Sequence, residues 1–133
     1  MSDGYHFKST LFEIEPGEDE EINPGRFGRQ AAAWLKQKLE QNGYQIEDII
    51  NEDWGRCLMC QRTPFSLWVG VGNIDSESSE SGKIVWHCFV VAEIAFFKRM
   101  FGKAAEVEAA RGKLDATLRA ILESEPAIEL VSE

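Results

Sequence analysis

The sequence has little positive charge, little histidine and no long hydrophobic run. Fourteen lysines and arginines stand against 23 aspartates and glutamates, giving a formal net charge of -9 over 133 residues. Such a charge repels phosphate backbones and anionic lipid headgroups. No apolar run reaches the roughly 18 residues that a membrane span needs. We therefore expect neither nucleic acid nor a membrane among the partners of this chain.

Cysteine is also scarce, and the three that occur are an odd number, which argues against a complete set of disulfides. The first residues, Met1-Ser2-Asp3-Gly4, lack the basic and apolar regions of a secretory signal. Both features predict a reduced, cytoplasmic protein. Hydrophobic residues at 44% and charged residues at 28% are typical of a globular chain, and the length suits a single domain over 1–133.

Hydrophobic periodicity predicts helices over residues 27–42 and 103–123. Trp34 and Leu118 lie on the apolar stripes of these helices, and truncation of either should cost stability. Gly43 stands where a left-handed cap belongs, and Pro126 ends the second helix. Strand patterns occupy residues 5–14, 46–50, 56–62, 65–71 and 83–94. We expect the order β-α-β-β-β-α, optionally followed by a strand over 128–131, in an α+β domain whose mostly antiparallel sheet is packed by two helices.

Alternation along two strands assigns their side chains to opposite faces. Leu67, Val69 and Val71 share one parity, whereas Trp68 shares the other with Gly70. Phe89 likewise falls on the parity opposite the best core row of its strand. If helices cover only one face, these aromatic side chains are exposed and mark an interface. Alternatively, the first strand, the segment Phe96–Phe101 or the C-terminal tail covers them.

Cys57-Leu58-Met59-Cys60 and His87-Cys88 together contain the residue types of a three-cysteine, one-histidine zinc site. The strand pattern argues against that site, because residues three apart or adjacent on a strand point to opposite faces. We expect small buried thiols, with no metal and no cofactor.

Glu52 and Asp53 form an adjacent carboxylate pair, and paired carboxylates can serve as acid and base in a pocket. Asp53-Trp54-Gly55 is more typical of a turn in which Gly55 adopts a conformation that other residues resist. A nucleophilic triad is disfavoured because only His6 and His87 are available and no Gly-x-Ser-x-Gly is present. We therefore favour a structural or partner-binding role for Glu52 and Asp53 over catalysis.

The densest charge lies in residues 13–21, where six of nine side chains are carboxylates. The run includes Glu18, Asp19, Glu20 and Glu21. Like charges at this density repel one another and predict a solvated loop. A cationic partner would relieve that repulsion, so the loop is a candidate contact; the alternative is that it only keeps the protein soluble.

Four short motifs are similar to a family of small, uncharacterised bacterial proteins. They are Asn23-Pro24-Gly25-Arg26-Phe27-Gly28, Trp34-Leu35, Glu52-Asp53-Trp54-Gly55 and Pro126-Ala127-Ile128-Glu129-Leu130-Val131. The family is marked by an Asn/Glu-Pro-Gly helix opener and a Glu-Asp-Trp-Gly-Trp motif, and Arg56 stands where the second tryptophan of that motif would be. The resemblance implies a one-domain α+β bacterial protein and brings no activity, cofactor or catalytic residue.

These observations favour a non-enzymatic module that binds a basic surface on another protein, as toxin-neutralising immunity proteins and phage or mobile-element inhibitors do. The candidate contacts are Glu18, Asp19, Glu20, Glu21, Glu52, Asp53, Trp54 and Trp68. Two alternatives stay open at this point: a small enzyme that uses Glu52 and Asp53 in a pocket, and a homodimer that hides the second sheet face against its copy.

Overall fold

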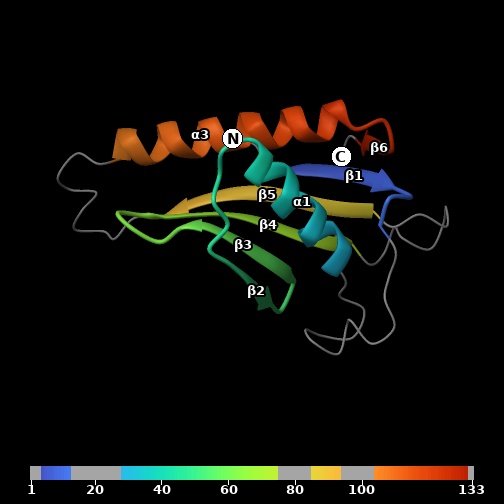
Figure 1. Cartoon of the computed structure of the whole chain (residues 1–133), viewed down its shortest axis with the longest axis horizontal. Helices are drawn as coiled ribbons and strands as arrows, with labels where there is room; N and C mark the ends of the chain where they lie inside the picture. The colour runs from blue at the N-terminus through green and yellow to red at the C-terminus, as the bar shows by residue number, and fades with distance from the viewer. Residues whose placement is uncertain (1–3, 13–27, 75–84, 94–103, 132–133) are drawn as a thin grey trace.

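Within the residues that the structure describes, the chain forms a single α+β domain in which two helices pack on one face of a six-stranded antiparallel sheet (Figure 1). The computed structural model describes residues 4–12, 28–74, 85–93 and 104–131. The elements are β1 (Tyr5–Ser9), α1 (Arg29–Gln41), β2 (Asp48–Glu52), β3 (Gly55–Gln61), β4 (Ser66–Ile74), β5 (Val85–Glu93), α3 (Ala104–Ser124) and β6 (Ile128–Val131). The predicted fold class is confirmed.

The strands lie side by side in the order β2-β3-β4-β5-β1-β6, and every pairing is antiparallel. Four strands separate the two helices, in agreement with the four predicted strand ranges between them and one more than the predicted order counts. The strand predicted at 46–50 lies at Asp48–Glu52, in a hairpin with β3. β5 lies in the interior of the sheet between β4 and β1, as its apolar character on both parities predicts. The C-terminal strand β6 pairs with β1 at the edge.

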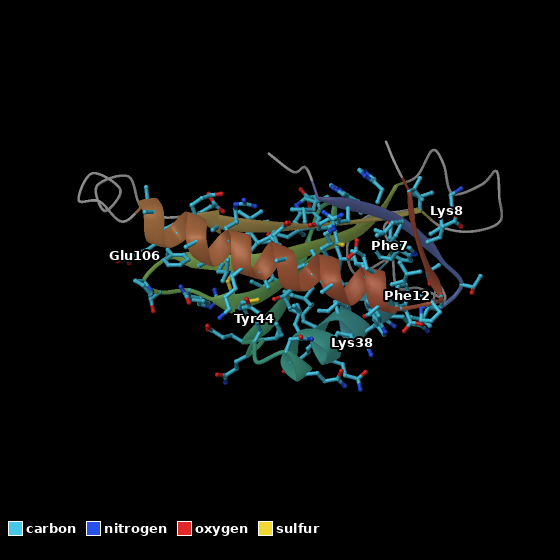
Figure 2. All side chains as sticks on the ribbon, turned by 90° about the horizontal axis from the view of Figure 1, so that it is seen from above. Phe7, Lys8, Phe12, Lys38, Tyr44 and Glu106 are labelled. Carbon is cyan, nitrogen blue, oxygen red and sulfur yellow. The ribbon has the colours of Figure 1, made fainter. Side chains whose placement is uncertain are left out.

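Both helices lie on the same side of the sheet, which we call the helical face (Figures 1 and 2). Strand residues of one parity meet apolar positions of α1 and α3 there, and the most deeply buried side chains have almost no exposed surface. Phe7 and Phe12 extend this core beside the helices in Figure 2, with ring centroids 6.4 Å apart. The core includes Phe7, Leu35, Leu39, Leu58, Val69, Val71, Trp86, Leu114, Leu118 and Leu122.

The two helices follow their predicted apolar stripes, with one difference on α1. Leu118 is fully buried on α3, as predicted. On α1 the buried positions are Ala31, Ala32, Leu35 and Leu39, whereas Trp34 is only half-buried at the margin of the core. Trp34 packs edge-on against Phe12, and Lys38 Nζ lies 5.9 Å from the centre of its ring. The large ring of Trp34 thus closes the side of the core.

The ends of the helices follow their sequence signals. Gly43 has a φ of 91°, the left-handed conformation that suits glycine after a helix, and its N–H bonds to the Glu40 carbonyl. α3 ends at Ser124, just before Pro126. Neither of the two helices is long and apolar enough to cross a membrane, within the ranges that the structure describes.

Candidate functional site

The sheet face opposite α1 and α3 carries a group of aromatic side chains. The register aligns Ile50, Cys57, Gly70 and Phe89 across β2, β3, β4 and β5. A neighbouring row runs through Asp48, Met59, Trp68 and Val91. These rows alternate with the rows of the helical face, so their side chains point away from the helices. We call this side the aromatic face.

Three rings form the centre of the aromatic face, and we call them the aromatic cluster: Trp54, Trp68 and Phe89. Trp54 stacks on Trp68 with ring centroids 5.9 Å apart and ring planes at 22°. Phe89 contacts both indoles, at centroid distances of 5.3 Å to Trp54 and 5.9 Å to Trp68. All three side chains are half-buried. Separations this short leave no room for a ligand between the rings, so the cluster presents a surface rather than a cage.

Gly70 makes room for this cluster. A Cβ atom at Gly70 would lie 2.4 Å from Cζ of Phe89 and within 3 Å of both neighbouring ring carbons. The Phe89 ring therefore lies directly over the Gly70 backbone on the neighbouring strand. A cross-strand pair of a glycine and an aromatic ring restores the packing that a glycine lacks. Gly70 thus lets the Phe89 ring pack against the strand backbone, where it contacts both indoles.

The turn that carries Trp54 is held against β4 by two facing glycines. Asp53 and Trp54 form the turn between β2 and β3, as predicted. The predicted reason for Gly55 is wrong, because Gly55 does not have positive φ. A Cβ at Gly55 would lie 2.3 Å from the Val71 carbonyl oxygen, and one at Gly72 would lie 2.5 Å from that of Trp54. Close backbone approach explains both glycines.

The two histidines lie together beside the cluster. His6 on β1 is paired in register with His87 on β5, and their rings stack 4.5 Å apart with planes at 7°. His87 also lies 5.0 Å from Phe89, centroid to centroid. Ring-to-ring contacts therefore continue from the cluster across β5 to β1. The sequence does not predict this contact, because it depends on the pairing of β1 with β5, which are far apart in the chain.

Carboxylates flank the aromatic cluster. Glu52 lies at the end of β2 next to the Trp54 turn, and Glu93 lies at the end of β5 on the same parity as Phe89. Both side chains are exposed, and neither makes an ion pair with any residue that the structure describes. Asp48 lies at the β2 end of the row that contains Trp68, and its Oδ2 pairs with Arg62 Nη2 at 3.6 Å. The aromatic face is therefore bordered by acid at its β2 edge and at the end of β5.

The Cys57 thiol reports the charge on this part of the surface. Its pKa is raised to about 11, first by burial and then by the negative charges of Glu52, Asp48 and Glu93, with Arg62 acting in the opposite direction. Three carboxylates and one arginine therefore act on the same thiol. The charges close enough to act on this thiol are therefore mainly negative, and Cys57 stays protonated at neutral pH.

The cysteines lie as the strand pattern predicts. Cys57 belongs to the aromatic face, whereas Cys60 packs against the core of the helical face. His87 and Cys88 also point to opposite faces, and Cys88 is fully buried. Burial is the main cause that raises the pKa of Cys60 to about 12, and burial also raises the pKa of Cys88. Within the described parts of the chain, no group of three or more histidine, cysteine or acidic side chains is placed to hold a metal.

Two of the three segments that the sequence offered as covers for Trp68 and Phe89 do not cover them. β1 pairs with β5, and β6 pairs with β1, so both extend the sheet sideways. The third, Phe96–Phe101, lies outside the described residues. Of the helices, α1 and α3 both contact the other face.

The structure brings together half of the predicted contact residues. Glu52, Asp53, Trp54 and Trp68 lie at or beside the aromatic cluster, whereas Glu18, Asp19, Glu20 and Glu21 are outside the described residues. Sequence reasoning missed Glu93 and Asp48. Glu93 shares the parity of Phe89 in its strand, and that signal identifies it. Asp48 lies inside the predicted strand 46–50, but its place in the row of Trp68 depends on the pairing of β2 with β3 and of β3 with β4, which the sequence does not show.

Comparison of the chain with protein-family models, with curated proteins and with solved structures found no match. The resemblance to small bacterial proteins stays a prediction. Arg56, the residue in place of the second tryptophan of that motif, is 5% exposed on the helical face, where its Nη1 donates to Asn51 Oδ1 at 2.7 Å. That position points away from the aromatic cluster.

Proposed function

We propose that this protein is a non-enzymatic module that binds a protein with a basic surface through its aromatic face. The observation that carries this proposal is the position of the cluster. Trp54, Trp68 and Phe89 contact one another on a face that neither α1 nor α3 contacts, with the exposed carboxylates of Glu52 and Glu93 beside them. Aromatic side chains ringed by charge are the usual centres of binding energy in protein interfaces.

Charge selects the class of partner. The chain carries a formal charge of -9, and the carboxylates near Cys57 outnumber the cations there. A negative surface accelerates association with basic proteins such as nucleases and slows association with acidic ones. An inhibitor that acts by occupying a basic surface, as immunity proteins do, fits this surface. The cytoplasmic location stays a prediction.

Two alternatives are less well supported. An enzyme that uses Glu52 and Asp53 needs a concave, shielded site, but both side chains are exposed at the end of the β2–β3 hairpin. A homodimer formed by two aromatic faces would place Glu52, Glu93 and Asp48 of one copy near the same residues of the other. Repulsion between those carboxylates disfavours that dimer.

Capture of partners from the native host tests the proposal. Mass spectrometry would compare the proteins retained by three immobilised baits: the wild type, Trp68→Ala and Glu40→Gln. Glu40→Gln is the matched control, because Glu40 is an exposed residue of α1. We expect a basic protein that is retained by wild type and Glu40→Gln and lost with Trp68→Ala, and whose association rate falls as salt rises. Retention by Trp68→Ala, or an association rate indifferent to salt, would contradict the proposal, as would a stable dimer of the free protein that shields Trp68.

The acidic loop is tested separately. Neutralising Glu18, Asp19, Glu20 and Glu21 together should slow association with the captured partner and flatten its salt dependence, if the loop takes part. An unchanged rate and an unchanged salt dependence would leave the loop a solvated segment and the aromatic face the whole binding site.

A further inference from the structure

We infer that the aromatic face recognises arginine side chains of its partner, with the guanidinium stacked on an indole of the aromatic cluster and paired with Glu52 or Glu93. This inference rests on the proposed function and makes it more specific. The occupant is an arginine-bearing segment of a basic protein, and three properties favour it.

The first property is the shape of the surface. Trp54 and Trp68 lie nearly parallel, with planes at 22° and centroids 5.9 Å apart, and Phe89 fills the third side at 70° to Trp68. Because the rings contact one another, only their outward surfaces and edges can meet a partner. A flat ligand group can lie on such a surface, whereas a spherical group would need a cage of rings around it.

The second property is the position of the negative charges. Glu52 lies at the Trp54 end of the cluster, and Glu93 is paired in register with Ser66, two residues before Trp68 on β4. Each indole thus has a carboxylate beside it, and neither carboxylate is neutralised by a described residue. The Cys57 thiol, placed between them, experiences the negative charge of both. A cation that stacks on either indole therefore also meets a carboxylate.

The third property is the chemistry of the cation, which favours arginine over lysine. Guanidinium is planar, stacks on aromatic faces and presents a fork of N–H donors that fits a carboxylate. The ammonium of lysine is compact, strongly hydrated and offers no plane for stacking. Lys38 over Trp34 shows that a lysine can approach an indole in this protein, but that lysine lies on the same helix as its ring. A partner side chain that arrives from solution has to give up more hydration if it is lysine.

The experiment uses two synthetic peptides of equal length and charge, one alternating arginine with glycine and the other lysine with glycine. Titration of the ¹⁵N-labelled full chain at low salt is followed through the four indole N–H signals, which belong to Trp34, Trp54, Trp68 and Trp86. We expect the arginine peptide to bind about three- to tenfold more tightly than the lysine peptide. Only the Trp54 and Trp68 signals should shift, because Trp34 and Trp86 pack with the helical face.

Variants sharpen the result. Trp68→Leu should remove most of the preference for arginine, and Trp68→Phe, which keeps a ring, should retain part of it. Glu52→Gln and Glu93→Gln should weaken both peptides, while Glu40→Gln on α1 should weaken neither. The dispersion of the remaining amide signals verifies that each variant is folded.

The outcomes distinguish this inference from the proposed function. Equal affinity for the two peptides, reduced alike by Glu52→Gln, would overturn arginine recognition and leave a basic partner standing. Shifts at Trp34, or an arginine preference that survives Trp68→Leu and Trp54→Leu together, would also overturn it. If neither peptide binds at low salt, the proposed function falls with the inference.

Discussion

On the helical face, two helices cover the strands and side chains such as Val69, Val71 and Leu118 have no exposed surface. On the aromatic face, the same strands carry Trp68 and Phe89, which are covered by Trp54 and by each other and remain half-buried. The first arrangement excludes water completely and contributes most of the stability. The second leaves large apolar rings at the surface beside carboxylates. Each face should therefore respond differently to substitution.

The largest contrast is expected between two residues of the helices. Leu118→Ala removes a fully buried side chain and should lower the free energy of unfolding by about 2–5 kcal/mol. Trp34→Ala, at the half-buried margin of the same core, should cost less despite the larger ring. Chemical denaturation of both variants measures the difference. Equal losses would mean that the margin of the helical face is packed as tightly as its centre.

Alkaline pH should destabilise the protein mainly through the helical face. Burial and then the hydrogen bond to Asp115 raise the pKa of Tyr5 to about 12, and burial raises those of the three cysteines. A group whose pKa is higher in the folded than in the unfolded state stabilises the fold fully at a pH below its unfolded-state pKa. That stabilisation is lost as the pH rises from the unfolded-state pKa through the folded-state pKa. Stability should therefore fall from about pH 9 upward. The slope is steepest for the fully buried Cys88, at most about 1.4 kcal/mol per pH unit, and is smaller for Tyr5 and Cys57 because water screens these groups.

Two variants assign that loss to a face. Tyr5→Phe removes the phenolic O–H, which donates to Asp115 Oδ2 at 2.8 Å, and should flatten the loss of stability above pH 10. Cys57→Ala removes the thiol of the aromatic face. If Cys57→Ala flattens the loss more than Cys88→Ala does, the aromatic face is the better shielded of the two, contrary to our expectation.

The third effect concerns Gly70. Gly70→Ala places a Cβ within 3 Å of the Phe89 ring and should displace that ring at a cost of about 1–3 kcal/mol. The altered near-ultraviolet signal of Trp54 and Trp68 would report the displacement. Gly112→Ala on α3 is the matched control, because nothing lies within 4 Å of its added Cβ and alanine favours the helix. Similar destabilisation of both variants would exclude a special role for Gly70.

The smallest effect on stability is expected for Glu52→Gln. The side chain is exposed and makes no described ion pair, so the free energy of unfolding should change by less than about 0.5 kcal/mol. The pKa of Cys57 should fall, because Glu52 is the largest of the charges that raise it. Thiol reactivity as a function of pH measures this change. An unchanged thiol titration would mean that Glu52 does not contribute to the negative potential of the aromatic face.

Much of this fold follows from local patterns in the sequence. Alternation in β4 predicts which of Val69 and Trp68 faces the helices, and the period of α3 predicts the burial of Leu118. The position of Trp54 could not be predicted, because it depends on close contact between Gly55 and Gly72, which are 17 positions apart. The stacking of His6 on His87 likewise requires knowing that β1 lies next to β5. Local signals give the elements, and pairing between distant strands decides which side chains meet.

The facing glycines at 55 and 72 have a consequence for how this surface can change. They let the backbone at the tip of the β2–β3 hairpin lie directly against β4, and the ring contacts of Trp54 with Trp68 and Phe89 add to that backbone contact. A different side chain at 54 would project from the same place. One substitution at residue 54 would therefore change the contacts that this surface offers to a partner, while the backbone of the hairpin keeps its place beside β4.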